Sequence, residues 1–382
     1  MTNQSNRIVI VGGGIAGLAA AVRLAQSGQA VTVLERARLG SGASTKNQGW
    51  LFSGALFARE HPGIASLCHE SLQATIAFCP EALETGHDGA VFLVSDASQE
   101  RWTRAWNEAG IPFSPIPQSH VVERIPYHPT TETRNAYLLP DRSIRVDRLL
   151  KGLADAAVAA GAEIRPETEV ARLIRAGDEV QGVVTKQGEQ IRSALVVLAA
   201  NTHDPALLPE LTDQRHSNNC QVVALKSHLI AIENGPSTWP FCVPDADGLN
   251  HLPHPPHSVF GTNRWIPVDD PSNEEPVAAE LDRIRDHIRS LFPQLSSRFV
   301  ESAAWAGTTM HAVPPGRELP TEVSWPAVVD HARERTAIEG AVSVFAGRAT
   351  LWAPLAEEIL RVVSTKVGEP AAEFAAPPWR SS

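Results

Sequence analysis

The sequence predicts an α/β and α+β protein in which a Rossmann-like domain is interleaved with a second domain built on a mixed β-sheet. Three observations predict this fold. A glycine-rich loop joins a strand to a helix at the start of the chain, and apolar strands recur at residues 194–200 and 342–346. Segments rich in proline, with short alternating strands, separate these blocks. The length of 382 residues suits one or two domains.

The glycine-rich loop follows a β-branched run at residues 7–11 that predicts a buried strand. It reads Gly-Gly-Gly-Ile-Ala-Gly, which satisfies G-x-G-x-x-G, and apolar residues at helical spacing follow it. The first glycine permits a tight turn, the second lets the backbone approach a pyrophosphate, and the third lets the helix pack against the strand. The helix start offers N–H groups to phosphates. The expected contacts are Gly12, Gly14, Ile15, Ala16 and Gly17.

A second buried strand is expected at residues 30–34, with Glu35 at its end. A carboxylate there can accept hydrogen bonds from the ribose hydroxyls of an adenosine. Strand, helix, strand and terminal acid stand in register, which is far more specific than a glycine motif alone. The first part of the chain therefore predicts a dinucleotide site that includes Glu35 and Arg36.

The next segment favours FAD over a nicotinamide. Residues 40–49 form a polar loop of small residues, and an apolar helix is expected over about 64–83, whereas a nicotinamide dehydrogenase usually continues into another βα unit. This segment resembles the D-amino-acid oxidase superfamily, which includes glycine oxidase, sarcosine oxidase and glycerol-3-phosphate dehydrogenase. The resemblance implies that Ser44, Thr45 and Lys46 wrap the flavin phosphates and that the strand from Gly49 to Gly54 passes the ring.

Later blocks extend the resemblance. It implies that the backbone of Val170 holds the adenine and that the apolar strand ending at Ala199 and Ala200 borders the cofactor. Relatives usually have a glycine next, and Asn201 stands there instead, which also tolerates a left-handed backbone. Near the end of the chain, a strand enters a turn that faces the flavin in the family, with a helix starting near Leu355. Its residues are Gly347, Arg348, Ala349, Thr350 and Leu351.

The predicted domains are discontinuous. Residues 1–85, 141–220 and 334–382 are assigned to the FAD-binding domain, and residues 86–140 and 221–333 to the substrate domain. Within the latter we expect strands at 220–232, 258–262 and 299–305 and an amphipathic helix at 273–295.

Five residues are candidates for the substrate site. Arg348 can contact a carboxylate or the flavin, and Trp50 stands where many relatives have a histidine. Lys226 and His228 share one face of a strand, loosely like a pattern of glycerol-3-phosphate dehydrogenases, although an exposed polar face is an equal alternative. Thr308 follows the Trp-x-Gly strand where relatives carry an anion-binding arginine, so a substrate that is larger, neutral or anchored elsewhere is expected. Arg264 and Arg317 are weaker anion partners.

The leading functional interpretation is hydride removal from a CH–NH carbon of a small amine or amino-acid-like substrate. Oxygen, a quinone or another acceptor would reoxidise the FAD. A CH–OH dehydrogenase of the same superfamily is an alternative. A flavin-dependent hydroxylase or halogenase would carry a Gly-Asp motif where this chain has Ala346-Gly347-Arg348, and a non-catalytic flavin-binding protein is the third alternative.

Composition and charge exclude some partners and cellular locations. The net charge is −10 and Lys and Arg form no run, which argues against a nucleic-acid partner. No apolar stretch reaches the length of a membrane span and the first residues do not read as a signal peptide, so we expect a cytoplasmic protein. Polyproline II geometry would align His251, His254 and His257, but a proline-rich loop with incidental histidines is simpler, and no metal is expected.

The FAD is expected to be bound non-covalently. Some relatives attach it through a cysteine near the C-terminal turn or a histidine near the N-terminal loop. This chain has no cysteine after Cys242 and no histidine between Met1 and His61. The sequence does not indicate an oligomeric state.

Overall fold

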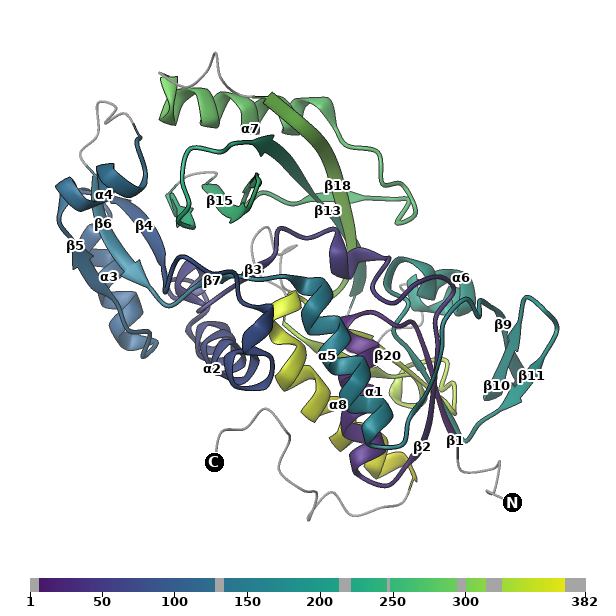
Figure 1. Cartoon of the computed structure of the whole chain (residues 1–382). Coiled ribbons are helices and arrows are strands. Elements are labelled where there is room, and N and C mark those ends of the chain that lie inside the picture. The colour runs from purple at the N-terminus through teal and green to yellow at the C-terminus, as the bar shows by residue number, and fades with distance from the viewer. Residues whose placement is uncertain are drawn as a thin grey trace.

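The computed structural model describes residues 7–127, 134–212, 221–245, 248–293, 300–313 and 325–367. They form two lobes that meet across the middle of the molecule (Figure 1). The lower lobe in that view contains the first strand and the last helix, and the upper lobe contains the two longest strands (Figure 1).

The lower lobe is built on a six-stranded sheet with the order β19-β20-β12-β1-β2-β8. Its central strands are parallel, and Val9 aligns with Val196 on one side and Thr32 on the other. Their apolar runs suit strands that are covered on both faces. The strands are β1 (Arg7–Val11), β2 (Ala30–Leu34), β8 (Glu163–Arg165), β12 (Leu195–Leu198), β19 (Ala327–Asp330) and β20 (Ala341–Phe345).

Helices cover one face of this sheet and a small sheet covers the other. Helices α1 (Ile15–Gln26), α5 (Val146–Ala159) and α8 (Trp352–Val367) pack side by side, and Leu18, Leu153 and Leu360 join one buried cluster (Figure 1). On the opposite face, Leu173 and Val183 pack with strand residues of the large sheet. They belong to a three-stranded sheet of β9 (Val170–Ala176), β10 (Glu179–Thr185) and β11 (Gln190–Arg192).

The upper lobe is built on a nine-stranded sheet with the order β17-β13-β16-β15-β14-β4-β6-β5, and β18 pairs with β13. The β14–β4 pair is parallel and its neighbours are antiparallel, so the sheet is mixed and the predicted fold class is confirmed. The strands are β4 (Ala90–Ser95), β5 (Ser114–Ile116), β6 (Arg134–Leu139), β13 (Gln221–Glu233), β14 (Phe241–Cys242), β15 (Leu249–His254), β16 (His257–Thr262), β17 (Ile266–Val268) and β18 (Val300–Val313).

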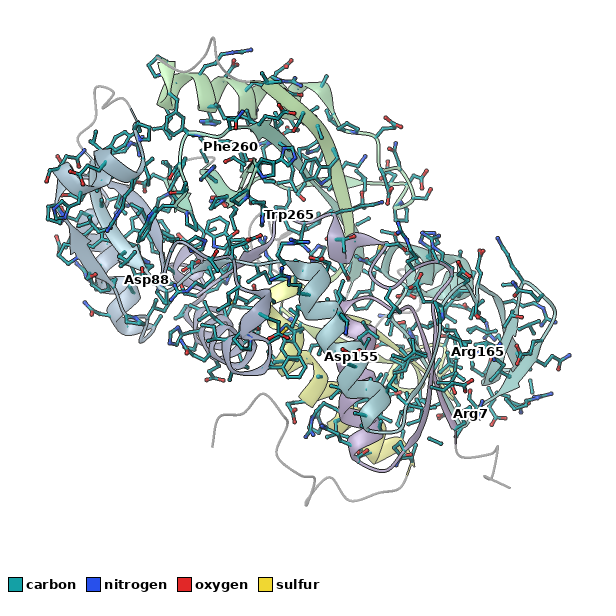
Figure 2. The ribbon with its side chains drawn as sticks, viewed as in Figure 1. Arg7, Asp88, Asp155, Arg165, Phe260 and Trp265 are labelled. Atoms are coloured by element: carbon teal, nitrogen blue, oxygen red, sulfur yellow. The ribbon has the colours of Figure 1, made fainter. Side chains whose placement is uncertain are left out.

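Three helices pack on this upper lobe. Helix α7 (Ala278–Leu291) covers the sheet through Leu281 and Ile284, which pack with Phe260, labelled below α7 in Figure 2. Helices α3 (Gln99–Glu108) and α4 (Gln118–Arg124) lie beside β4 and β6 (Figure 1). Between the lobes lie α2 (Pro62–Phe78), the short helix α6 (Asp204–Leu207) and the pair β3 (Trp50–Leu51) and β7 (Arg142–Ser143).

Differences from the prediction include two elements of the upper lobe and one strand of the lower lobe. Helix α7 begins at Ala278 rather than Asn273, because Pro276 disfavours helical backbone at the residue before it. Strand β18 continues to Val313 rather than ending at Trp305, because it pairs along the whole of β13. Strand β19 lies within the stretch assigned to the substrate domain but pairs with β20, so the boundary between the sheets falls before Ala327.

The histidine-rich run does not adopt polyproline II geometry. It forms the β15–β16 hairpin, in which His251 contacts Trp239 O at 3.1 Å and Ser258 Oγ at 2.9 Å. His254 instead contacts Glu84 Oε1 at 3.1 Å. Across the described part of the chain, no group of three or more His, Cys, Asp or Glu side chains is arranged to hold a metal ion.

Candidate functional site

A cavity of about 450 Å³ lies between the two lobes. Val11 and Leu34, at the carboxyl ends of β1 and β2, form one side of it. Ser227 of β13 and Gly307 and Thr309 of β18 form part of the opposite side. Ligands of open α/β sheets bind at the carboxyl ends of parallel strands, so the cavity lies where this fold places a dinucleotide.

The turn between β1 and α1 brings three backbone segments into close contact. Gly12 has a φ of +113°, and a Cβ there would lie 2.5 Å from Ala199 O. A Cβ on Gly17 would lie 2.0 Å from Gly12 O. Both positions therefore require glycine, and together they place the start of α1 at the cavity wall.

The loop at residues 40–49 is fixed by contacts to both lobes. Ser44 Oγ accepts a hydrogen bond of 3.0 Å from Ile15 N, and Thr45 Oγ1 donates to Gly40 O at 2.7 Å. Lys46 forms an ion pair with Glu274, and its carbonyl accepts a 2.9 Å bond from Trp305 Nε1. The loop thus spans from the start of α1 to the β18 sheet.

Glu35 closes the end of the cavity next to β2. Its Oε2 accepts from Gly13 N at 2.8 Å and its Oε1 from Ala37 N at 3.0 Å, so the carboxylate is held in one position. A carboxylate oxygen can accept a second bond, which leaves capacity for ribose hydroxyls. Val170 and Lys186 line the cavity at this end.

The strand β3 and the turn before α8 form the other end. Thr350 Oγ1 accepts a 3.1 Å bond from Phe52 N and donates to Trp50 O at 3.4 Å, which ties the turn to the strand. Trp50 donates its indole N–H to the buried Asp141 at 2.9 Å and stacks on Phe52 with ring centroids 4.5 Å apart. Burial raises the pKa of Asp141 to about 6. Trp50 is therefore a wall residue whose N–H is already bonded.

Aromatic rings surround the guanidinium of Arg348. Its Cζ lies 4.6 Å from the ring centroid of Trp265 and 5.1 Å from that of Phe57, and Phe52 lies at 5.9 Å. Figure 2 labels Trp265 between the lobes, below the sheet that carries Phe260. Cations over aromatic faces are stabilised by about 0.5–2 kcal/mol, so these rings hold the positive charge at the cavity wall.

An imidazole beside Trp265 pairs with a hydroxyl of the cavity lining. Thr309 lines the cavity, and its Oγ1 lies 2.6 Å from His311 Nε2. The His311 side chain is buried, and its ring meets the edge of Trp265 at a centroid distance of 5.0 Å. Burial, and secondly the charge of Arg348, lowers the pKa of His311 to about 3. His311 is therefore neutral at physiological pH.

Most of the predicted cofactor contacts line the cavity. Three predicted residues lie behind the cavity wall and support the shape of the cavity. Gly17 packs against the β1–α1 turn, Thr45 forms a hydrogen bond within its loop, and Thr350 ties β3 to the turn before α8. Gly49 and Leu351 also lie outside the lining. The predicted residues in the lining are Gly12, Gly14, Ile15, Ala16, Glu35, Arg36, Ser44, Lys46, Val170, Ala199, Ala200, Gly347, Arg348 and Ala349.

The structure does not bring Lys226 and His228 to the cavity. Ser227 and Leu229 line the cavity, and alternation along β13 turns their neighbours to the other face. Lys226 Nζ donates to Asn273 Oδ1 at 3.2 Å and Glu275 O at 2.8 Å, and His228 Nε2 accepts from Val277 N at 3.0 Å. Residues 273–277, predicted as helix, form no regular secondary structure and occupy that face.

The side chain of Thr308, like that of its cross-strand neighbour Lys226, forms its hydrogen bond on the face turned away from the cavity. It borders the cavity, but its hydroxyl donates to Asn273 O at 3.2 Å on the far face of β18. Arg348, from another segment, lies 4.6 Å from the centroid of the Trp265 ring that contacts His311, and the expectation of a substrate that is larger, neutral or anchored elsewhere than at Thr308 stays a prediction. Arg264 pairs with Glu280 at 3.0 Å, and Arg317 lies outside the described residues.

Several lining residues carry no motif that sequence could have revealed. Trp265 lies in the loop between β16 and β17, and Asn250 and Asn263 meet through a 2.8 Å side-chain bond. Gln48 reaches Asn250 O at 3.2 Å. A second cavity of about 170 Å³ shares Asn263 and Arg348 with the first. These residues come together only through the pairing of the sheet.

Asn201 joins the two lobes at the end of β12. Its φ is +58°, the left-handed backbone that the sequence led us to expect, and its Oδ1 accepts a 2.6 Å bond from Met310 N. The Asp204 carboxylate, three residues further along the chain, accepts hydrogen bonds from Ala200 N at 2.9 Å and Asn201 N at 3.1 Å. Burial raises the pKa of Asp204 to about 8.

Comparison with known proteins identifies the family. The model of the DAO family, described as FAD dependent oxidoreductase, matches residues 7–325. The chain belongs to this family. This is the family that the resemblance indicated.

The relatives differ in the compound that they are named for. Anaerobic glycerol-3-phosphate dehydrogenase subunit A1 of Haloferax volcanii is 26% identical over 388 residues, which cover 96% of this chain and 64% of that protein. Glycine oxidase of Pseudomonas aeruginosa is 33% identical over 218 residues, which cover 54% of this chain and 58% of that protein. The chain thus spans less than two thirds of the length of either relative.

A solved structure shares the fold over nearly the whole chain. Glycine oxidase from Geobacillus kaustophilus superposes with a TM-score of 0.71 at 20% identity and covers 98% of each chain.

The cavity of the present chain fits the cofactor of the family, FAD. Glycines leave room beside the start of α1, and a fixed carboxylate and a polar loop lie on either side of it. Among the described residues, no helix is both long and apolar enough to cross a membrane.

Proposed function

We propose that the enzyme oxidises a CH–NH bond of a small amine or amino-acid-like substrate whose carboxylate binds Arg348. The observation that carries this proposal is the position of the guanidinium, held by Trp265, Phe57 and Phe52 at the cavity end beside β3 and β18. FAD supplies the chemistry by accepting a hydride from the substrate carbon. Oxygen or another acceptor then reoxidises it.

The cofactor is held by the part of the cavity that lies between Glu35 and Gly347. In this proposal Glu35 accepts the ribose hydroxyls, and the start of α1 together with Ser44 faces the pyrophosphate. The turn at residues 347–349 and the indole of Trp50 border the ring. The protein's own task is to orient the substrate and exclude water.

The charges at the substrate end favour a carboxylate over a phosphate. Phosphate monoesters carry close to two negative charges at neutral pH. In the described part of the lining, Arg36, Lys46 and Lys186 lie toward the adenosine and loop side, and Lys46 is paired with Glu274. Lys226 faces away from the cavity, whereas the Arg348 guanidinium lies over Trp265 at the substrate end.

A CH–OH substrate is the second candidate. It is favoured by the glycerol-3-phosphate dehydrogenase subunit of Haloferax volcanii, which matches 96% of this chain, whereas the glycine oxidase of Pseudomonas aeruginosa matches 54%. A hydroxy acid would place its carboxylate on Arg348 in the same way. The two candidates therefore differ in the atom that is oxidised and share the anchor.

The deciding experiment is an anaerobic screen of the FAD-loaded protein. Amino acids, N-methylated amino acids, hydroxy acids and glycerol 3-phosphate are added separately, and bleaching of the flavin absorption is recorded. We expect amino-acid-like compounds to bleach it and to release peroxide when air is admitted. Bleaching by glycerol 3-phosphate alone would overturn the proposal.

A further inference from the structure

The Thr309–His311 pair contains a buried atom without a partner. His311 Nε2 lies 2.6 Å from Thr309 Oγ1, and His311 Nδ1 is buried with no hydrogen-bond partner. An unsatisfied buried polar atom costs about 1–3 kcal/mol, so the arrangement has to be explained. Thr309 is the member of the pair that lines the cavity.

The unpartnered atom decides which ring nitrogen carries the proton. If Nε2 accepted from Thr309, the proton would sit on Nδ1 as a buried N–H without an acceptor. If Nε2–H donates to Thr309 Oγ, Nδ1 has a bare lone pair instead. Buried acceptors without partners are better tolerated than buried N–H groups without partners. The second arrangement is therefore the stable one.

This tautomer sets the direction of the threonine hydroxyl. Because Thr309 Oγ accepts from His311, its own O–H proton is left to donate elsewhere. We propose that Thr309, positioned by His311, donates its hydroxyl to the substrate carboxylate that Arg348 binds. This inference rests on the proposed function and adds the second residue of the anion site.

The pair defines the class of substrate. A neutral hydroxyl donor beside one guanidinium offers a single positive charge, which matches a monocarboxylate and leaves a phosphate monoester with unbalanced charge. His311 adds no charge, because burial and Arg348 lower its pKa to about 3. The site therefore selects monocarboxylates by combining one charge with one neutral donor.

The test measures ligand binding to the FAD-loaded protein without turnover. Benzoate and inorganic phosphate are titrated separately, and the dissociation constant is taken from the change in the flavin visible spectrum. Thr309→Val removes the hydroxyl and is expected to weaken benzoate binding about 10- to 100-fold, the value of a hydrogen bond to a charged group. Thr309→Ser keeps the hydroxyl and should bind within about threefold of the natural protein, well below that loss.

The histidine is tested through the same readout. His311→Met removes the donor to Thr309, whereas His311→Gln keeps an N–H at the Nε2 position. We expect the first to weaken benzoate binding as Thr309→Val does, the second to restore it, and the double variant Thr309→Val with His311→Met to be no weaker than Thr309→Val. Thr308→Val is the matched control, because that hydroxyl bonds Asn273 O on the other face. If His311→Met fails to fold, the Thr309→Val and Thr309→Ser pair still decides.

The outcomes separate this inference from the proposed function. Benzoate binding that needs Arg348 but is unchanged in Thr309→Val would overturn the inference and leave the proposed function standing. Additive losses in the double variant would also overturn it. A spectrum that responds to inorganic phosphate and not to benzoate would overturn both.

Discussion

The two ends of the cavity are built in different ways. The cofactor end comes mainly from one stretch, residues 7–49, and depends on backbone: Gly12 and Gly17 permit close approach, and Ser44 and Glu35 accept from N–H groups of the turn. The substrate end depends on side chains from four separate segments, represented by Phe52, Trp265, Thr309 and Arg348.

This difference explains why one family serves unlike substrates. Backbone contacts to a constant cofactor need a fixed spacing along the chain, and a change of side chain leaves them intact. Recognition by side chains can change one residue at a time, because the sheet supplies positions and does not dictate their chemistry. The proposed use of Arg348 from the last turn, in place of the strand arginine that many relatives carry, is an example of such a change.

The largest expected effect breaks the cofactor end. Gly17→Val places a side chain where a Cβ already lies 2.0 Å from Gly12 O, a backbone atom that cannot move away without moving β1. Such overpacking costs about 1–3 kcal/mol or more, and we expect the purified protein to lack bound FAD. Flavin absorption per protein measures this. Gly152→Ala is the control, since its nearest neighbour, Cys79 Sγ, is 3.3 Å away, and FAD loss there too would contradict the explanation.

The second prediction breaks the substrate end and spares the cofactor. Arg348→Met keeps the length of the side chain but removes the charge, and loss of one partner of a charged pair costs about 2–5 kcal/mol. Benzoate binding should therefore weaken at least about 30-fold while the FAD content stays unchanged. Arg264→Met, which removes an exposed arginine paired with Glu280, should do neither. Tight benzoate binding in Arg348→Met would place the anion site elsewhere.

The third prediction sharpens the boundary of the substrate end. Lys226→Met removes two hydrogen bonds to the segment at residues 273–277, on the face of β13 that is turned away from the cavity. We expect a loss of about 1–3 kcal/mol in the free energy of unfolding, measured in urea. Benzoate affinity should stay within about twofold, because no hydrogen bond to the anion is lost. A loss of affinity without a loss of stability would return Lys226 to the site.

The smallest effect concerns Asp204, where the lobes meet. Its folded pKa of about 8 lies above the unfolded value of 3.8, so its contribution to stability is fully present below pH 3.8 and is lost as the pH rises through about 8. Asp204→Asn does not titrate and keeps an acceptor for Ala200 N. Relative to the natural protein, its Tm should rise by about 2–4 °C between pH 5 and pH 8. A Tm difference that is independent of pH would show that Asp204 does not titrate in this range.

The comparison also shows how far prediction from sequence reached. The βαβ unit, the polar loop and the left-handed position of Asn201 were predictable because each depends on residues close together in the chain. The partners of Lys226 were not, since they depend on where residues 273–277 pack. Those residues were expected as helix but form no regular secondary structure.

By itself the sequence determined the cofactor, because glycine spacing and a strand-terminal acid fix a backbone geometry that few other residues permit. The tertiary structure decided the substrate end. Pairing of β13 with β18 determined which of Ser227 and Lys226 faces the cavity. Packing between the lobes brought Arg348 beside Trp265, whose ring also contacts His311, the partner of Thr309. The side chains of a strand alternate between two faces, and which face turns to the cavity depends on what packs on each. The sequence of one strand does not contain that information.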